Sequence, residues 1–272
     1  HLVIRRQRQM CIRDSYTAAT GMAAQQRNID TTANNLANVN TTGYKKSKVH
    51  FQDLLYHNER TAGVPSSVST QVPVGLHVGH GVKFIGTEKI HTQGNLENTG
   101  NDLDLSIDGH GFFQILQPNG IVGYSRDGHF NIDGMGRLVT NDGMLLDPEI
   151  NIPQDTRKVE VGFDGTVTVF LRDETMPEAI GSIQLARFQN PAGLTPIGKN
   201  LYVSTPASGN AIVDAPGASS MGTLTQGFLE RSNVSLVEEM VNMITSQRAY
   251  EVNSKAIQSA DEMLKNTNNL VR

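Results

Sequence analysis

The chain has little of what several classes of protein require. A single cysteine, Cys11, among 272 residues excludes an internal disulfide framework and a cluster of thiolate metal ligands. Tryptophan is absent, and no apolar run approaches the roughly 18–20 residues of a membrane-spanning helix. The 23 basic and 27 acidic residues leave a formal charge of −4. That balance argues against a nucleic-acid-binding protein, because phosphate contacts call for a basic face.

Motifs for catalysis and cofactor binding are missing as well. The sequence contains neither GxGxxG nor GxxxxGK[ST], and it has no GxSxG elbow and no HExxH pair. We therefore expect no enzymatic activity, no catalytic, cofactor-binding or metal-binding residues and no cofactor. Neither a nucleic acid nor a small-molecule substrate is expected as a partner.

Two groups of polar residues resemble binding sites but have simpler explanations. His77 and His80 have a spacing that metal sites use, but no cysteine or well-placed acid completes a ligand set. We expect them to be exposed loop histidines. Lys45, Lys46 and Lys48 form a basic cluster too short for nucleic-acid binding, and it is expected to lie on a solvated edge.

A third group consists of three acidic residues, Asp102, Asp104 and Asp108. Their spacing does not match a calcium-binding EF-hand loop. Asp102 and Asp104 alternate with Leu103 and Leu105, as solvent-facing residues of a strand would. We expect a strand with an exposed acidic face.

Residues 1–15 look foreign to the rest of the chain. The short apolar stretch Leu2–Ile4 precedes the arginines, which is the reverse of a secretory signal peptide. The segment resembles a non-native leader derived from a sequencing adapter. A basic arm for an acidic partner is the alternative. Cys11 is given no functional role.

Helical periodicity begins at about residue 16. Apolar and small residues then recur at steps of three and four, and Gly43 is placed to end the helix with a left-handed turn. We expect a helix over residues 16–43. Its predicted buried seam comprises Ala19, Met22, Gln26, Ile29, Ala33 and Leu36.

A second helix is expected at the other end, from Val234 to about Asn268 within the region 231–272. Ser232 or Asn233 could cap it. Its predicted seam starts with Val234, Val237, Val241 and Ile244 and drifts to Gln247, Tyr250, Ser254, Ile257 and Leu264. Because no helical period lies between the two helices, we expect them to pair as a coiled coil.

The middle of the chain indicates short antiparallel strands. Asp-Gly favours two-residue hairpin turns, because both residues tolerate positive φ. Five such pairs occur, at Asp108-Gly109, Asp127-Gly128, Asp133-Gly134, Asp142-Gly143 and Asp164-Gly165. Residues 61–70 are expected to form a loop or extended ribbon, and residues 207–220 a second loop.

The fold class predicted is therefore α+β, with long terminal helices and an antiparallel β-rich middle domain. We expect an inner domain made of helices 16–43 and 231–272. Residues 44–95 should form a connecting β segment with an insertion, residues 96–187 an outer β domain and residues 188–230 a returning β segment.

Four blocks of the sequence resemble the flagellar rod and hook protein family. They are NNLANVNTTGYK (Asn34–Lys45), HTQGNLENTGNDLDLSIDGHGFFQI (His91–Ile115), YSRDGHFNIDGMGRLVTNDG (Tyr124–Gly143) and VEEMVNMITSQRAYEVNSKAI (Val237–Ile257). Within the family, the distal rod subunits are the most similar. That resemblance rests on FQDLLY (Phe51–Tyr56), on the glycine-rich stretch Pro73–Val82 and on FQNPAGLTPIGKNLYVST (Phe188–Thr205).

The resemblance implies a structural subunit that polymerises helically into a hollow drive shaft, which transmits motor torque to the hook. It implies a location in the rod of the flagellar basal body, in the periplasmic space. It also implies delivery by the flagellar type III export apparatus without a cleaved signal peptide. The implied partners are further copies of the chain, proximal rod subunits, hook-side subunits and ring bushing proteins.

Two hypotheses and two alternatives accompany this interpretation. The terminal helices are expected to be poorly ordered in the monomer and to fold on assembly. The insertion at residues 61–81 is expected to add contacts between subunits that keep the shaft straight. The alternatives are a hook or proximal rod subunit of the same family, or a secreted β-rich adhesin.

Overall fold

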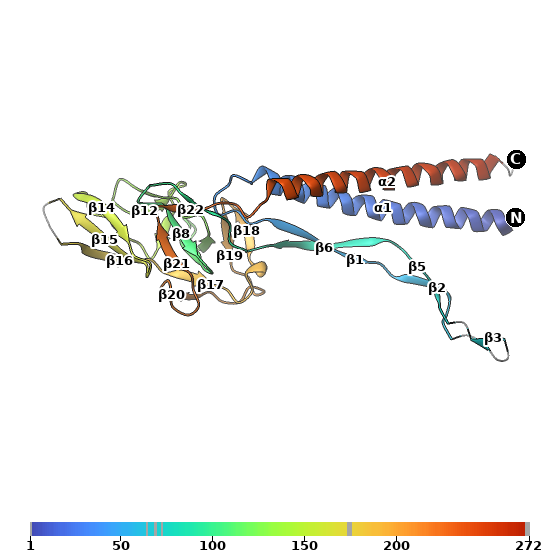
Figure 1. Cartoon of the computed structure of the whole chain (residues 1–272), viewed down its shortest axis with the longest axis horizontal. Coiled ribbons are helices and arrows are strands. Elements are labelled where there is room, and N and C mark those ends of the chain that lie inside the picture. The colour runs from blue at the N-terminus through green and yellow to red at the C-terminus, as the bar shows by residue number, and fades with distance from the viewer. Residues whose placement is uncertain (1, 64, 68–69, 72, 173–175, 270–272) are drawn as a thin grey trace. The chain divides into compact units, whose positions relative to one another are not determined.

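The chain folds into two compact units, which are described separately (Figure 1). The computed structural model describes residues 2–63, 65–67, 70–71, 73–172 and 176–269. Unit 1 combines His1–Leu36, Ser47–Glu88 and Leu236–Arg272. Unit 2 combines Ala37–Lys46 and Lys89–Ser235. Each unit is therefore built from stretches that lie far apart in the sequence.

Two long helices dominate unit 1, α1 (Leu2–Ala37) and α2 (Leu236–Asn269). The predicted start of the first helix at residue 16 is wrong. No proline or glycine interrupts the chain before Gly21, so the helix extends back to Leu2. It ends at Ala37 and not at Gly43, although Gly43 has the predicted positive φ, 66°. None of the helices in the described residues is long and apolar enough to cross a membrane.

The second helix has nearly the predicted limits, but neither proposed cap acts as one. Asn233 instead accepts a hydrogen bond from the backbone N–H of Lys46 and donates to the carbonyl of Ile90. The Ser232 hydroxyl accepts from the N–H of Val234. Both side chains belong to unit 2.

The remainder of unit 1 is an extended ribbon of paired strands (Figure 1). Strand β1 (Ser47–Asp53) pairs with β6 (Val82–Lys89), and β2 (Tyr56–Arg60) pairs antiparallel with β5 (Leu76–Gly79). At the tip, β3 (Pro65–Ser67) pairs with β4 (Thr70–Gln71). The ribbon predicted at residues 61–70 is therefore confirmed; positions 64, 68 and 69 lie outside the described residues.

Short strands make up most of unit 2. They are β7 (Leu96–Asn98), β8 (Leu105–Asp108), β9 (Phe112–Leu116), β10 (Val122–Ser125), β11 (Phe130–Ile132), β12 (Leu138–Thr140), β13 (Leu145–Asp147), β14 (Thr156–Val161), β15 (Thr166–Leu171), β16 (Glu178–Ser182), β17 (Leu185–Arg187), β18 (Thr195–Gly198), β19 (Leu201–Val203), β20 (Ile212–Asp214), β21 (Thr223–Gln226) and β22 (Phe228–Glu230). A short 3₁₀ helix spans Pro191–Gly193. The loop predicted at residues 207–220 is interrupted only by β20 among these strands.

These strands form antiparallel sheets, as predicted. The largest among the described residues has the order β11-β12-β13-β9-β10-β19-β18, and β17 pairs with both β9 and β20. Strands β14, β15 and β16 form a meander, while β8 pairs with β21 and β7 with β22. The last strands of unit 2 therefore pair with its first.

The apolar core of unit 2 lies among these sheets. Its fully buried members come from strands spread over the whole unit and include Leu105, Ile107, Phe113, Ile115, Phe130, Leu146, Val167, Val169 and Leu185. A second cluster contains Phe112, Tyr124, Phe188 and Tyr202, whose rings meet edge to face. This arrangement supplies hydrophobic stabilisation within the unit itself.

Three of the five Asp-Gly pairs occur in hairpins, as predicted. They connect β11 to β12, β12 to β13 and β14 to β15. For Asp108-Gly109 and Asp127-Gly128 the prediction is wrong, because each connects strands that pair with other partners. Turn chemistry acts locally, whereas the partner of β8 arrives from the far end of unit 2.

Candidate assembly site

Polar residues hold the two helices of unit 1 together. The Asn35 amide donates to Glu239 Oε2 at 3.2 Å, and the Asn28 amide donates to Ser246 Oγ at 2.8 Å. One heptad further along, a Cβ added at Gly21 would lie 2.9 Å from the Asn253 amide nitrogen. The positions step by seven residues in opposite directions, so the helices run antiparallel with a heptad spacing. We call these three pairs the polar ladder.

Other residues buried in the helices are also small or polar. Among the side chains for which burial is described, they are Cys11, Ala18, Ala24, Thr32 and Asn35 on α1 and Glu239, Ser246 and Ala260 on α2. Burying small side chains removes little apolar surface from water. The helix pair therefore gains far less hydrophobic stabilisation than a seam of leucine and isoleucine would provide.

The seam predicted for the first helix has the right period but the wrong phase. Ala19 and Ala33 are exposed, and Ile29 is only half-buried. The buried positions Ala18 and Thr32 lie one residue earlier. One residue corresponds to a rotation of about 100° around a helix, so the predicted stripe lies to one side of the buried one.

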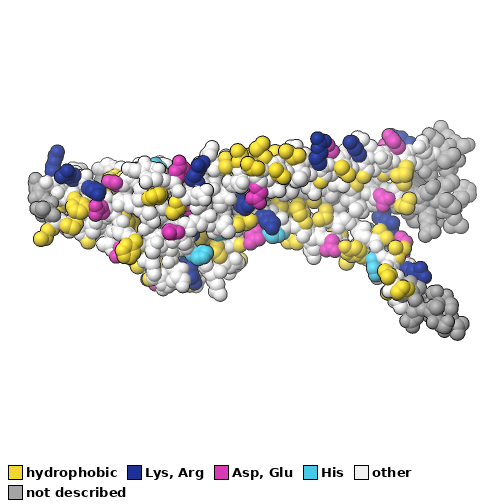
Figure 2. Space-filling view, viewed as in Figure 1, with side chains coloured by type: hydrophobic (Ala, Val, Ile, Leu, Met, Phe, Trp, Pro, Cys, Tyr) yellow, Lys and Arg dark blue, Asp and Glu magenta, His cyan; other side chains and the backbone are white. Residues whose placement is uncertain are grey.

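The seam predicted for the second helix is wrong in its first half, while Ser254, Ile257 and Leu264 in its second half are half-buried. Val237, Val241 and Ile244 are 71%, 54% and 56% exposed. Val234 is buried, but it precedes α2. Leu236 and Met240 are exposed beside them, and Figure 2 shows hydrophobic side chains gathered over the first turns of α2. We call Leu236, Val237, Met240, Val241 and Ile244 the apolar stripe.

Exposed apolar side chains also line the ribbon of unit 1. Leu55, Val74, Leu76 and Ile85 all lie largely in solvent. A two-stranded ribbon has only marginal stability alone in water. Monomeric soluble proteins rarely expose large contiguous apolar patches, which mark interaction surfaces. Unit 1 thus presents the chain's candidate surfaces for association.

Asn35 connects the ribbon to both helices. Its amide donates to the Ser47 carbonyl at 2.9 Å, and its Oδ1 accepts from the Ser47 N–H at 2.9 Å. The same amide also reaches Glu239. Sequence analysis missed this residue. Its partners Ser47 and Glu239 lie outside its own helix, so helical periodicity gave no signal for it.

The histidines considered for metal binding lie on the ribbon. His77 is exposed on β5, and its ring hydrogen-bonds the side-chain oxygen of Asn58; His80 is half-buried beside it. Across the described ranges, no three His, Cys, Asp or Glu side chains are grouped in a way that could hold a metal ion. The arrangement offers no ligand set.

The prediction of a solvated basic cluster is wrong for Lys45. Its side chain is 0% exposed and pairs with Glu230, 185 residues further along. Lys48 is exposed as predicted, and Lys46 is half-buried. A lysine can be buried only if its charge finds a partner, and no local pattern reveals one so distant.

The prediction of an exposed acidic face is wrong for Asp104. That side chain is buried and accepts hydrogen bonds from Thr99 Oγ1 at 2.5 Å, Asn101 Nδ2 at 3.0 Å and His129 Nδ1 at 2.6 Å. Asp102 is exposed as predicted. Asp104 thus ties together the turn that leads into β8.

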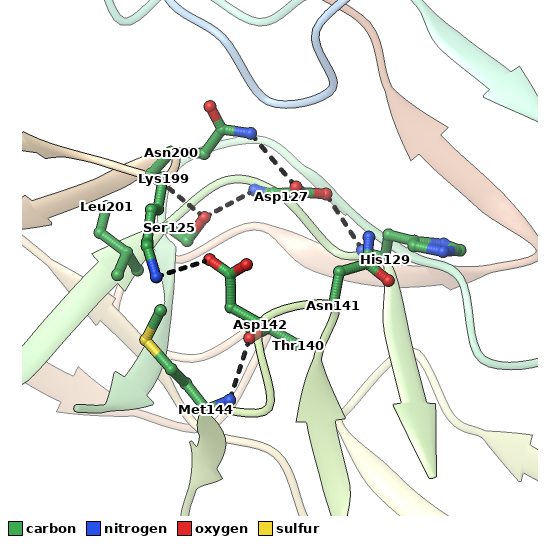
Figure 3. Close-up of a pocket in the computed structure, with 10 residues that line it drawn as sticks. All are labelled: Ser125, Asp127, His129, Thr140, Asn141, Asp142, Met144, Lys199, Asn200 and Leu201. Carbon is green, nitrogen blue, oxygen red and sulfur yellow. Dashed lines mark hydrogen bonds and ion pairs between the residues drawn. The ribbon is translucent and has the colours of Figure 1, made fainter. Parts of the chain in front are cut away.

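A small polar pocket of about 200 Å³ lies in unit 2 (Figure 3). Ser125 donates its hydroxyl to the Asn200 carbonyl at 3.0 Å and accepts from the Asp127 N–H at 3.0 Å. The Asn200 amide donates to Asp127 Oδ2, and Lys199 pairs with Asp142 at 3.3 Å. These groups bond one another, and the Ser125 hydroxyl is already committed to a backbone carbonyl. The pocket therefore lacks a paired nucleophile and base.

Three family models match the chain in order. Residues 16–45 match a model described as flagella basal body rod protein, and residues 106–169 match the flagellar hook protein FlgE/F/G D1 domain. Residues 225–270 match the flagellar basal body rod FlgEFG protein C-terminal model.

Curated relatives extend the similarity over almost the whole chain. The flagellar basal-body rod protein FlgG of Buchnera aphidicola subsp. Schizaphis graminum is 48% identical over 255 residues, covering 94% of this chain and 98% of the relative. FlgG of Borreliella burgdorferi is 48% identical over 263 residues, covering 96% and 99%. FlgG of Bacillus subtilis is 37% identical over 269 residues, covering 96% and 100%.

Proposed function

Because the chain belongs to the flagellar basal-body rod family, with relatives named FlgG along nearly its full length, we propose that it is a structural subunit of the distal rod. Copies stack helically into a hollow shaft that transmits motor torque to the hook. The subunit acts by passing mechanical load to its neighbours in the shaft and carries out no catalysis. Its location is the flagellar basal body.

The observation that best supports this proposal is that the inner and outer faces of the helices carry different kinds of side chain. Small and polar residues face the partner helix within the monomer, whereas the apolar stripe of α2 faces outward. A subunit that completes its hydrophobic contacts only with neighbours would have this arrangement. In the polymer, the helices pack as coiled coils through these outward apolar residues.

Polymerisation of purified protein tests this role. Ile244→Ser removes a large apolar side chain from the stripe, whereas Ile212→Ser changes an isoleucine of similar exposure, 48% against 56%, on β20 of unit 2. The first variant should raise the concentration needed for sedimentable polymer by about tenfold, which corresponds to about 1.4 kcal/mol per contact. The second should polymerise as the unaltered chain does. Equal behaviour of the two variants would contradict a role for the stripe.

The terminal helices are proposed to become fully ordered only on assembly. A pair held by the polar ladder buries little apolar surface, so it offsets little of the ordering cost of about 1–2 kcal/mol per residue. Limited proteolysis of the monomer should leave a fragment near Lys45–Gly227 and remove both ends within minutes. Ends that resist cleavage in the monomer would refute this coupling.

The insertion at residues 61–81 is proposed to contact neighbouring subunits and keep the shaft straight. The described part of that segment is a narrow ribbon with exposed apolar side chains, including Val74 and Leu76. Deleting Thr61–Ser69 should yield polymers that bend measurably in electron micrographs. Straight polymers of unchanged stiffness would rule out this role.

The remaining assignments follow from the family resemblance. The chain is delivered by the flagellar type III export apparatus without a cleaved signal peptide and assembles in the periplasmic space. Proximal rod subunits, hook-side subunits and the ring bushing proteins are its partners. Pull-down of each class with polymerised and monomeric chain tests these contacts one at a time.

A further inference from the structure

Unit 2 contains a buried cluster of three charged side chains. Lys45, Arg126 and Glu230 are 0%, 4% and 1% exposed. Lys45 Nζ lies 2.5 Å from Glu230 Oε1, and the Arg126 guanidinium lies 3.3 Å from Glu230 Oε2. The Glu230 carboxylate therefore forms ion pairs with two buried cations. We call these three residues the charge cluster.

The two cations depend on that carboxylate. Burial lowers the pKa of both Lys45 and Arg126, and Glu230 opposes the shift in each case. Lys45 also donates to the Thr92 carbonyl, while Arg126 donates to the carbonyls of Ile107 and Gly109. Carbonyl groups satisfy hydrogen bonds but carry no net charge. Without Glu230, two like charges would remain buried and uncompensated.

Glu230 also connects backbone segments. Its Oε1 accepts from the N–H of Gly94 at 2.8 Å, and its own carbonyl accepts from the N–H of Gly43 at 2.8 Å. A Cβ at Gly94 would lie 2.0 Å from the Arg231 carbonyl oxygen, so only glycine permits this close approach. Residues 37–46, 89–95 and 230–235 thus meet around one side chain.

The order of these residues along the chain is informative. Lys45 and Arg126 precede Glu230, as do strands β7 and β8, which pair with β22 and β21. Arg126 bonds the carbonyl of Ile107 on β8, and Glu230 ends β22. A contact that spans 185 residues carries a large loop-closure cost, so it is expected to form late.

We propose that Glu230 is a latch residue, whose pairing with Lys45 and Arg126 is the step that completes the folding of unit 2. Before that step the two cations are unpaired, and they keep the edge formed by β7, β8 and residues 37–46 open. Folding of unit 2 is thereby coupled to the presence of the chain segment from which α2 starts. This inference concerns unit 2 alone and holds whether or not the chain forms a rod.

Hydrogen exchange of the full-length chain at pH 7 provides the first test. Glu230→Gln keeps the shape of the side chain but removes its charge. It should raise exchange by at least about tenfold in peptides covering residues 37–46, 89–98 and 105–109, because the closed edge loses its compensating charge. Peptides of the β14–β16 meander should change little. Glu160→Gln, which breaks the exposed pair with Lys158, is the matched control and should alter neither region.

Folding kinetics give the second test. If the latch closes after the transition state, Glu230→Gln should speed unfolding by about tenfold and leave the refolding rate nearly unchanged. Refolding that slows in proportion, or exchange that rises uniformly across unit 2, would overturn the proposal. Slower refolding would place Glu230 in the folding nucleus. A uniform rise in exchange would show that Glu230 stabilises unit 2 as a whole and not this edge in particular.

A compensating variant keeps the proposal testable if Glu230→Gln does not fold. Adding Lys45→Met removes one of the two unpaired cations. The double variant Lys45→Met, Glu230→Gln should therefore fold and show exchange at residues 37–46 several-fold slower than Glu230→Gln alone. A double variant that is no better than the single variant would show that charge compensation is not the function of Glu230.

Discussion

Unit 2 and the helix pair of unit 1 bury opposite kinds of side chain. Unit 2 buries large apolar residues such as Phe113 and Leu185 and pairs its buried charges internally. The helix pair buries Asn35 and Ser246 and exposes Val237 and Ile244. The first can be stable by itself, whereas the second buries little apolar surface within the monomer.

Two buried glutamates show the same contrast on a smaller scale. Glu230 faces two cations and a backbone N–H. Glu239 accepts a hydrogen bond from the Asn35 amide at 3.2 Å. A charge held by oppositely charged groups favours one closed state. A polar contact between helices specifies register while adding little stability.

The largest expected effect lies in the core of unit 2. Phe113 is fully buried, and its ring centroid lies 5.2 Å from that of Phe130. Phe113→Ala should lower the free energy of unfolding by about 3–5 kcal/mol, measured by urea denaturation, because it removes apolar contacts and leaves a cavity. Phe163→Ala, at an exposed phenylalanine of the same unit, should change it by less than about 0.5 kcal/mol. Similar losses in both variants would contradict the assigned core.

Acid should weaken unit 2 through His91. Burial, together with the charges of Lys45, Arg126 and Lys89, lowers its pKa to about 4. The folded state then binds fewer protons than the unfolded state between pH 6.5 and 4, so stability present above pH 6.5 is lost as the pH falls to 4. The loss attributable to this group is up to about 3 kcal/mol.

A substitution separates this effect from other acid titrations. His91→Gln should flatten that part of the pH dependence of the unfolding free energy. His50→Gln, at the exposed pair with Glu88 in unit 1, should leave it in place. A slope that persists in His91→Gln would show that other groups cause the acid sensitivity.

A smaller effect is expected at the junction of helix and ribbon in unit 1. Asn35→Ala removes the hydrogen bonds to Ser47 and leaves Glu239 without that amide donor. The local opening free energy of α1 and α2 should fall by about 1–2 kcal/mol, seen as faster hydrogen exchange in helix peptides. Asn242→Ala, on the exposed face of α2, should leave exchange nearly unchanged. Unaltered exchange in both would mean that the polar ladder does not hold the pair.

The smallest effect on the monomer is expected at the apolar stripe. Ile244→Ser should change the unfolding free energy of the dilute monomer by less than about 0.5 kcal/mol, because this side chain is already in solvent. A loss above about 1 kcal/mol in urea denaturation would show that the stripe packs within the monomer. The proposed comparison between self-sufficient and incomplete regions would then fail.

Much of the architecture was predictable because its signals are local. Recurrence at steps of three and four predicted both helices, and the pair Asp164-Gly165 predicted the hairpin of β14 and β15. What failed was the assignment of faces. Ala18 and Ala19 have the same side chain, yet only Ala18 is buried, because the buried face of a helix is set by the helix against which it packs.

Burial of charged groups failed for a related reason. Lys45 lies in a run of basic residues and Asp104 in an alternating pattern, both of which favour solvent exposure. Their partners Glu230 and His129 are 185 and 25 residues away. A periodicity argument covers a few turns of helix or one strand, so it cannot bring such distant groups together.

Local patterns were enough to predict two terminal helices and a β-rich middle and, through four motif blocks, the family to which the chain belongs. Those properties depend on neighbouring residues and on short recurring patterns. Which helix faces are buried, which apolar side chains remain in solvent and how Glu230 pairs with two cations became visible only in the folded chain. These outcomes depend on contacts between distant segments, whose free energies are settled by packing and desolvation.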